Sequence, residues 1–314
     1  MAAGLVTAAQ ANALTIVANF DGSITSASNA VQIENSINKA LQFYGENFSN
    51  PVTVNINFAV SNSPDVLGQS STFIAFIPTT VYLDHLQAAS LAHPENAVLQ
   101  AALPFATAGN GATIANMFIT TPLARSLGFS LGAFGPFDAT ITLGAAYINF
   151  GDIPSPTLEY FANSVIQHEV DEVLGTGGAG SGVGGSTMGA IDLYRYSAPG
   201  LGSFTTDPNV PAYFSLDGGT TNIIDFNRSG AGDAGDWAKL TCIGPAQVQD
   251  YRACPGVPML GLTRSDVQVE ALQAIGWNLL PAGVPEPATW VSMLLGFFGM
   301  GAALRSRRGT TAAA

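Results

Sequence analysis

Hydrophobic and polar residues follow two different periods at the start of the chain. Residues 14–20 form an apolar, β-branched run that predicts a strand, and residues 52–60 alternate polar and apolar positions as a half-buried strand does. Between them, apolar residues over 27–47 recur at the spacing of an amphipathic helix, with Ser26 and Ser28 as candidate N-caps. The pattern therefore predicts a strand–helix–strand opening.

From residue 61 to 136 the pattern is weaker, and only residues 79–90 and 97–106 have helical spacing. Residues 138–150 again form a run typical of a strand, with a break at Gly144. No internal repeat is visible along the chain.

The clearest helical pattern lies between residues 157 and 174. Its apolar positions form one stripe, made of Leu158, Phe161, Val165, Ile166, Val170 and Val173. Gly175 is expected to end this helix, and the glycine-dense stretch that follows to Gly189 predicts irregular structure.

Regular elements are sparser from residue 190 to 280. Residues 213–216 favour a strand, and residues 265–275 favour a helix with Ser265 as N-cap and Gly276 as C-cap. Strands and helices in this order indicate an α+β fold.

The composition is that of a folded, acidic protein. Hydrophobic residues make up 47% of the 314 residues and charged residues only 10%, which is far from the composition of a disordered chain. Asp and Glu number 22 against 10 Lys and Arg, so the formal net charge is −12. A surface of that sign repels nucleic acid, and we expect no nucleic-acid partner.

One run, from His168 to Gly175, carries candidate chemistry in a chain with only three histidines. Residues four apart lie on one face of a helix, so His168 and Glu172 can bind the same metal ion. Glu169 is rotated by about 100° from His168 and can act as general base on a metal-bound water. The H-E-x-x-H signature of zinc hydrolases has a second histidine where this chain has Glu172.

An acidic surface helix is the alternative explanation of this run, and Asp171 would extend its acidic face. Carboxylates near the C-terminus of a helix oppose the helix dipole and repel one another, and a bound cation would remove that cost. We therefore favour a metal site. The other histidines, His85 and His93, lie in helical sequence and are expected to be structural or exposed. The sequence contains no nucleophile elbow, phosphate loop or dinucleotide fingerprint.

The C-terminal end combines three features of a sorting signal. The motif Val-Pro-Glu-Pro at 284–287 precedes an uncharged apolar run at 288–304, and arginines follow at positions 305, 307 and 308. The apolar run is near the short limit for a membrane-spanning helix, and trailing arginines fit a cytoplasmic end. A buried C-terminal helix is the alternative.

This pattern resembles the PEP-CTERM sorting domain of Gram-negative bacteria. The resemblance implies that residues 281–287 are a linker and that residues 288–314 are a transmembrane segment with a basic tail. It also implies transient anchoring in the inner membrane, processing by an exosortase-type enzyme, and delivery to the cell surface or the outside.

Export requires an N-terminal signal peptide, and residues 1–13 end in an Ala-Asn-Ala tripeptide that fits a cleavage site. We interpret them as the remnant of a signal peptide, with a disordered N-terminus as the alternative. In an exported chain, Cys242 and Cys254 are expected to form a disulfide. A zinc-binding pair is the weaker explanation, because two cysteines alone cannot complete a tetrahedral site.

The segments around the candidate helix resemble those of a group of PEP-CTERM-anchored bacterial metalloproteases of the zincin type. The resemblance rests on HEVDEVLG (168–175), DLYRYSAPG (192–200), YFSLDGGTTN (213–222), GDAGDWA (232–238) and ALQAIGW (271–277). It implies a catalytic domain over residues 14–280, with an N-terminal lobe of mixed β-sheet and helices (14–175) and an irregular C-terminal lobe (176–280). The substrate would lie in the cleft between the lobes, with His168 as first zinc ligand and Glu169 as general base.

A third metal ligand is needed, and the position that supplies it in one zincin group, three residues after Gly175, is here Gly178. We expect Asp192 to take this role, because a downstream carboxylate resembles the ligand supply of other zincin groups. Tyr194 and Tyr196 could then donate hydrogen bonds to a tetrahedral oxyanion. The rival ligands are Asp217, Asp225, Asp233 and Asp236.

Carboxylate ligands also affect the choice of metal. Glu172 is a harder ligand than histidine and admits Mn²⁺ or Ca²⁺ more readily beside the expected Zn²⁺. The Asp/Gly loops at 217–219 and 232–236 are either structural Ca²⁺ sites or solvated turns. We therefore expect an exported, surface-sorted zinc-dependent endopeptidase that hydrolyses protein or peptide substrates. The alternative is a catalytically inactive zincin-fold protein of the cell surface or extracellular matrix, which the exchange at Glu172 motivates.

Overall fold

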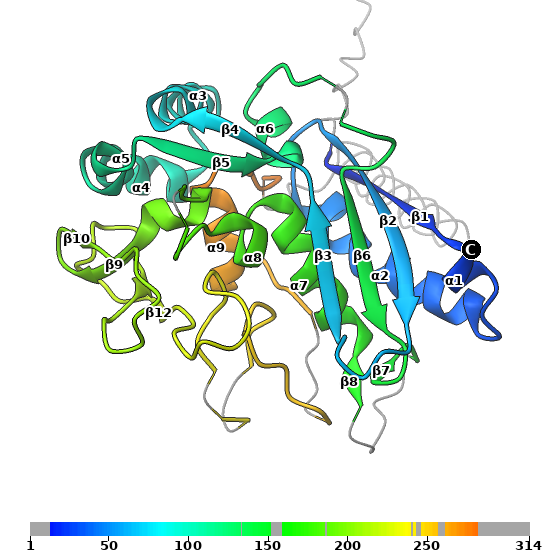
Figure 1. The fold of residues 1–314 in the computed structure, drawn as a ribbon. Helices are drawn as coiled ribbons and strands as arrows, with labels where there is room; N and C mark the ends of the chain where they lie inside the picture. Colours follow the sequence, from blue (N-terminus) through cyan, green and yellow to red (C-terminus); the bar gives the residue numbers. More distant parts are fainter. Residues whose placement is uncertain are drawn as a thin grey trace, which may run out of the picture. The chain divides into compact units, whose positions relative to one another are not determined.

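The first strands of the chain build a four-stranded mixed sheet. The computed structural model describes residues 13–132, 134–151, 159–185, 187–239, 241–242, 246–256 and 261–281. In spatial order the strands are β1 (Thr15–Phe20), β2 (Thr53–Ser61), β6 (Ala139–Gly144) and β3 (Gly68–Thr72). β1, β2 and β6 run parallel, whereas β3 runs antiparallel to β6 and lies at the edge of the sheet (Figure 1).

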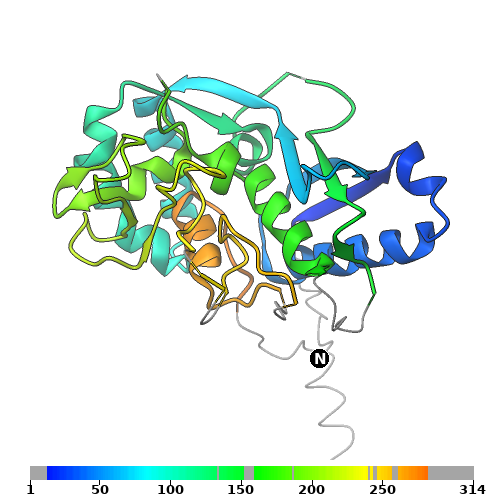
Figure 2. The same ribbon diagram turned by 60° about the horizontal axis from the view of Figure 1, so that its bottom comes forward.

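Two long helices cover one face of this sheet. α2 (Ala30–Asn47) and α7 (Ala162–Leu174) contact each other, and they contact β1 and β3 respectively (Figure 2). Polar groups hold the two helices together: the Tyr44 hydroxyl oxygen lies 3.0 Å from the Gln167 carbonyl oxygen, and the Gln167 amide donates to the Ala40 carbonyl (3.2 Å). The alternation predicted for β2 is confirmed, because Val54, Ile56 and Phe58 are all buried.

The strand–helix–strand opening is confirmed, but the predicted N-caps are wrong. Asn29 is the N-cap residue of α2, and Ser26 instead follows the last residue of an additional short helix, α1 (Gly22–Thr25). The Asp21 carboxylate accepts a hydrogen bond from the Ser23 N–H (2.8 Å) and so begins α1 directly after the strand.

The middle of the chain forms a strand pair and four helices. β4 (Ile74–Pro78) pairs antiparallel with β5 (Asn116–Thr120). The helices are α3 (Thr79–Ala92), α4 (Ala97–Ala108), α5 (Asn110–Thr113) and α6 (Thr121–Ser126). α3 and α4 confirm the helical spacing, whereas β3, β4, β5 and α6 had no clear pattern in the sequence.

The remaining elements are short. They are β7 (Ile148–Asn149), β8 (Tyr160–Phe161), α8 (Gly177–Gly180), the 3-10 helix η1 (Ala190–Tyr194), β9 (Arg195–Ala198), β10 (Leu201–Gly202), β11 (Tyr213–Phe214), β12 (Ile224–Asp225) and α9 (Val267–Ala274). β10, β9, β11 and β12 form a second sheet in that order. Most of the described residues between β12 and α9 have no regular structure.

Three predicted boundaries in this part are wrong. α7 begins at Ala162, because the two residues before it belong to β8. The glycine-dense stretch after α7 is not wholly irregular, since α8 lies within it. The N-cap residue of α9 is Asp266 rather than Ser265, and Gly276 follows the C-cap residue Ile275 with a φ of 117°.

The chain divides into a unit of residues 1–279 and a unit of residues 280–314. In the second unit, only residues 280 and 281 are described. The predicted signal-peptide remnant (except residue 13), the Pro-Glu-Pro motif and the apolar C-terminal run lie outside the described residues. No helix in the part that the structure describes has the length and apolarity to cross a membrane. The predicted α+β architecture is confirmed for the first unit.

Candidate metal centre

Helix α7 carries the predicted motif and ends at a glycine turn. Gly175 has a φ of 108°, and its N–H donates to the Asp171 carbonyl (3.1 Å) and the Glu172 carbonyl (3.0 Å). A residue with a Cβ rarely adopts this conformation, so glycine allows the chain to turn back beside the helix. As a result the Gly178 N–H donates to Glu172 Oε1 (3.0 Å).

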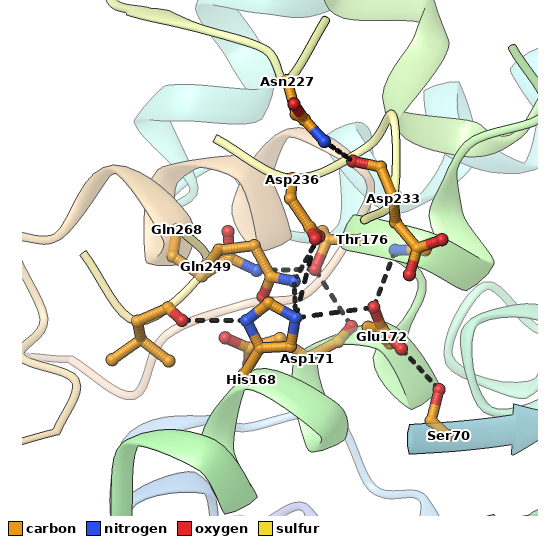
Figure 3. A network of polar contacts seen from close by, with 12 residues as sticks. Ser70, His168, Asp171, Glu172, Thr176, Asn227, Asp233, Asp236, Gln249 and Gln268 are labelled. Carbon is orange, nitrogen blue, oxygen red and sulfur yellow. Dashed lines mark hydrogen bonds and ion pairs between the residues drawn. The ribbon is translucent and has the colours of Figure 1, made fainter. Parts of the chain in front are cut away.

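The imidazole of His168 is oriented by a backbone carbonyl. Nδ1 lies 2.9 Å from the Val248 carbonyl oxygen, which can only accept, so Nδ1 carries a proton. Nε2 faces two carboxylate oxygens, Glu172 Oε1 at 3.6 Å and Asp236 Oδ2 at 3.7 Å (Figure 3). A metal-binding histidine has this arrangement, with one nitrogen held by an outer partner and the other directed at the ion.

Glu172 is held by donors on both oxygens. Ser70 on β3 donates to Oε2 (2.5 Å), and Gly178 donates to Oε1. Burial opposes ionisation of Glu172, but His168, Ser70 and Gly178 outweigh burial and lower the pKa of the carboxyl below its ordinary value. Glu172 is therefore ionised and fixed one helical turn after His168.

Asp236 reaches the cluster from a loop of the C-terminal part. Gln249 donates to Asp236 Oδ1 (2.9 Å), which leaves Oδ2 directed at His168. The loop is anchored at its neighbours: Arg195 donates to the Ala234 carbonyl (2.7 Å), and the Asn227 N–H donates to the Asp236 carbonyl (2.7 Å). A Cβ at Gly235 would collide with the Gly177 carbonyl, so only glycine permits this approach to the turn after α7.

These three side chains fit a divalent cation. Their donor atoms lie within 4.8 Å of one another, and His168, Glu172 and Asp236 form the one such group found among the described residues. Two ligands bound about 2.0–2.2 Å from one ion at a tetrahedral angle are about 3.3–3.6 Å apart. The separations of 3.6 Å and 3.7 Å from His168 Nε2 come close to that geometry.

The electrostatics of the cluster also favour a cation. Burial alone would lower the pKa of His168, but Asp236, Glu172 and Glu169 outweigh it and raise this pKa well above its ordinary value. Burial raises the pKa of Asp236 to about 7. Without a cation the excess negative charge is neutralised by protons, and a bound cation would replace these protons.

Glu169 lies beside this group without belonging to it. Burial and the Glu172 carboxylate raise the pKa of Glu169 well above its ordinary value. A Cβ at Gly68 on β3 would collide with the Glu169 carboxylate, so glycine provides the room for it. A cavity of about 240 Å³ opens over Glu169, and its apolar walls include Leu67, Val165 and Val248.

The predicted third ligand, Asp192, is not in the cluster. Its carboxylate is buried and accepts hydrogen bonds from Ser181 Oγ (2.7 Å) and from the N–H groups of Gly182 and Gly189 (both 2.8 Å). Asp192 therefore organises the glycine-rich loop after α8. The rival Asp236 takes the position that we had assigned to Asp192.

The other rival aspartates have separate roles. Asp217 accepts hydrogen bonds from Ser215 Oγ (2.8 Å) and the Thr221 N–H (2.8 Å), which favours a hydrogen-bonded turn over a calcium site. Asp225 accepts one from the Asn222 amide (2.9 Å). Asp233 is exposed and lines the cavity beside Glu172.

The expected oxyanion donors lie elsewhere. The Tyr194 hydroxyl donates to the Ala274 carbonyl (2.6 Å) on α9 and is buried. The Tyr196 hydroxyl is buried near Gly109, on the side of α4 and α5, and neither tyrosine lines the cavity. Tyr194 at the end of η1 and Tyr196 on β9 are therefore both buried away from the metal centre.

Asp171 does not extend an acidic face. It is fully buried toward α2, where the Tyr44 hydroxyl donates to its Oδ1 (2.7 Å), and burial raises its pKa to about 8. The structural assignment of the other histidines is confirmed, since His85 stacks on Phe129 with ring centroids 3.8 Å apart and His93 pairs with Glu95.

The predicted disulfide between Cys242 and Cys254 is present, with a Cα–Cα distance of 5.6 Å. It closes a loop that includes Val248 and Gln249, two residues that contact the metal ligands. The disulfide therefore supports the segment that orients His168. No family model, curated protein or solved structure matches the chain.

Proposed function

We propose that the chain is a metal-dependent endopeptidase of the zincin type, with His168, Glu172 and Asp236 as protein ligands of a divalent cation. The observation that carries the proposal is the convergence of three ligand atoms beside the carboxyl group of Glu169, which lines the same cavity. A bound divalent cation would polarise a carbonyl and lower the pKa of water.

Glu169 has the properties of a general base. Burial and the Glu172 carboxylate raise its pKa above the ordinary value, which makes the ionised carboxyl a stronger base. Leu67, Val165 and Val248 make part of the cavity wall apolar, which strengthens these interactions. Glu169 would thus take a proton from the attacking water and pass it to the leaving amine.

The edge strand β3 supports a peptide substrate. In an antiparallel pair every second backbone amide and carbonyl faces the partner strand, so the alternate groups of β3 face away from β6. Leu67, Gly68, Gln69 and Ser70 line the cavity along this edge. An extended peptide added alongside β3 would bring its backbone over Glu169.

The first sheet has three parallel strands and an antiparallel edge strand, and α7 carries the motif. These features support the zincin resemblance. Zinc is our first candidate, and Mn²⁺ is the second because two of the three ligands are carboxylates. The C-terminal pattern supports surface sorting through an exosortase-type enzyme.

The proposal is tested by metal analysis and by a matched pair of variants. Purified protein is expected to contain one equivalent of zinc or manganese by mass spectrometry and to cleave casein in a chelator-sensitive reaction. Glu169→Gln should retain the metal and lose activity by at least about 100-fold, within the range of general-base effects. Glu95→Gln makes the same substitution at an exposed site, and this variant should keep both the bound metal and the activity. Protein without bound metal, or full activity in Glu169→Gln, contradicts the proposal.

A second candidate is a zincin-fold surface protein that binds a cation without hydrolysis. The carboxylate at position 172 favours it, because added negative charge lowers the Lewis acidity of the cation. Stoichiometric metal with no cleavage across a peptide library would select this second function.

A further inference from the structure

Gln249 lies closer to the metal centre than its role as a neighbour of Asp236 requires. Its side chain is fully buried, and its amide nitrogen lies 3.3 Å from His168 Nε2 and 2.9 Å from Asp236 Oδ1 (Figure 3). The 3.3 Å separation from His168 Nε2 is also about the distance between two ligands of one tetrahedral ion. The end of the Gln249 side chain thus occupies a ligand position relative to His168.

Hydrogen-bond chemistry explains why nitrogen rather than oxygen faces the cluster. Asp236 Oδ1 is an acceptor, and it accepts a hydrogen bond from the Gln249 amide nitrogen. An amide oxygen in the same position could not donate to Asp236. The cost is that Gln249 Oε1 is buried with no hydrogen-bond partner among the described residues.

A cation bound to His168 Nε2 reverses this preference. An N–H group directed at a cation is repelled, whereas an amide oxygen is attracted. The Gln249 side chain is fully buried and cannot turn out to solvent, and its amide packs directly against Gly177. The backbone of Gln249 is also fixed, because its carbonyl accepts from the Trp237 N–H (2.9 Å). Rotation about the Cγ–Cδ bond exchanges nitrogen for oxygen with almost no change in volume.

We propose that Gln249 is a fourth protein ligand of the cation, which turns its side-chain amide on binding so that Oε1 replaces Nε2 beside His168. The inference rests on the proposed metal centre and extends it. The ligand set becomes one imidazole nitrogen and three oxygens, from Glu172, Asp236 and Gln249. Such a set suits a harder cation than zinc, because oxygen ligands favour Mn²⁺ relative to imidazole-rich sites. Four protein ligands would fill a tetrahedral zinc ion, whereas an octahedral cation such as Mn²⁺ keeps positions for the attacking water.

The contrasting explanation is that Gln249 only positions Asp236 by donating to its Oδ1. Replacement of Gln249 by glutamate separates the two roles, because a carboxylate can bind a cation but cannot donate to Asp236 while ionised. Gln249→Met keeps the approximate volume and removes both functions. Gln247→Met is the matched control, since Gln247 lies two residues away, lines the cavity over Glu169 and is only half-buried.

Titration calorimetry of the metal-stripped full chain with Mn²⁺ alone, and separately with Zn²⁺, tests the inference near neutral pH. Gln249→Glu is expected to bind Mn²⁺ at least as tightly as the unaltered protein. Gln249→Met should bind it about 10–100-fold more weakly, the range found when groups around a metal site are removed. Gln247→Met should bind it unchanged.

Three results overturn the inference. If Gln249→Glu is weakened as much as Gln249→Met while the unaltered protein binds metal, Gln249 only positions Asp236 and the proposed function stands. Equal affinity in all four proteins likewise removes Gln249 from the ligand set. If the unaltered protein binds neither metal, the proposed function fails and the inference fails with it. Circular dichroism confirms folding, and the Gln249→Glu result alone decides the case should Gln249→Met not fold.

Discussion

The assignment of Asp236, rather than Asp192, as a metal ligand gives a prediction with opposite outcomes at two buried aspartates. Asp236→Asn removes a carboxylate 3.7 Å from His168 Nε2. Asp192→Asn makes the same change at a carboxylate that accepts three hydrogen bonds from the glycine-rich loop. Asp236→Asn should lose metal affinity and keep its stability. Asp192→Asn should keep metal affinity and lose stability.

The magnitudes follow from the contacts. Removal of a group that only hydrogen-bonds to a metal ligand typically weakens metal binding about 10–100-fold. Loss of a direct ligand at Asp236 should therefore weaken metal binding at least about 100-fold. In chelator, Asp236→Asn should be as stable as the unaltered protein, because burial already raises the pKa of this carboxyl to about 7. Asp192→Asn converts three charge-assisted hydrogen bonds to weaker ones, for a loss of about 2 kcal/mol in the free energy of unfolding.

Calorimetric titration with Zn²⁺ and thermal unfolding in chelator measure the two effects separately. A loss of about 2 kcal/mol corresponds to a fall of about 4–8 °C in melting temperature for a unit of this size. If Asp192→Asn abolished metal binding while Asp236→Asn retained it, the ligand set derived from the geometry would be wrong. Loss of metal in both variants with native-like stability would also contradict the separation of roles.

Three further predictions concern the surroundings of the cluster. A Cβ at Gly178 would lie 2.7 Å from Glu172 Oε1, so Gly178→Ala should weaken metal binding about 10-fold in calorimetry. Gly132→Ala, in open space, should leave it unchanged, and equal affinities would show that Glu172 does not bind the cation. Burial raises the pKa of Asp171 from 3.8 to about 8. The neutral carboxyl therefore makes its full contribution to stability below about pH 4, and this contribution is lost as the pH rises through 8. Urea unfolding in chelator should therefore show Asp171→Asn gaining stability relative to the unaltered protein between about pH 5 and pH 8; a constant difference refutes this assignment. The double variant Cys242→Ser, Cys254→Ser should lose about 3 kcal/mol of unfolding free energy by loop closure and also bind metal more weakly, because the loop includes Val248 and Gln249. Unchanged metal affinity in calorimetry would show that the disulfide does not support the centre.

The motif helix was predictable because its signals are local. Apolar spacing, the spacing of His168 and Glu172, and the end at Gly175 depend on the helical repeat and on one glycine. The same holds for β1, α2 and β2, where the period of apolar residues changes within a short stretch.

The third ligand was not predictable by the same means. Asp236 and Asp192 are both buried aspartates in glycine-rich sequence, and their roles differ through contacts made far along the chain. The Asp236 loop approaches α7 because Gly235 packs on Gly177 and because Arg195 holds the Ala234 carbonyl. The only local sign is that Asp236 directly precedes a tryptophan, Trp237, which is fully buried.

Asp171 was misassigned for a related physical reason. A helical projection shows which residues share a face, but it does not show that a partner on another helix can accommodate a buried acid. Tyr44 on α2 supplies that partner through its hydroxyl. The repulsion that we expected between Asp171 and its acidic neighbours is reduced because burial keeps Asp171 protonated near neutral pH.

The departure from the H-E-x-x-H pattern at position 172 is supported by the groups around it. Ser70 donates to one carboxylate oxygen of Glu172 and the Gly178 N–H donates to the other. A neutral imidazole that binds a cation through one nitrogen has only an N–H left, so it could not accept both hydrogen bonds. Two donors from separate segments, the edge strand and the glycine turn, would lose their acceptor if histidine stood here. The surroundings are therefore matched to a carboxylate, which argues against the reading of Glu172 as a lost histidine in an otherwise unchanged zinc site.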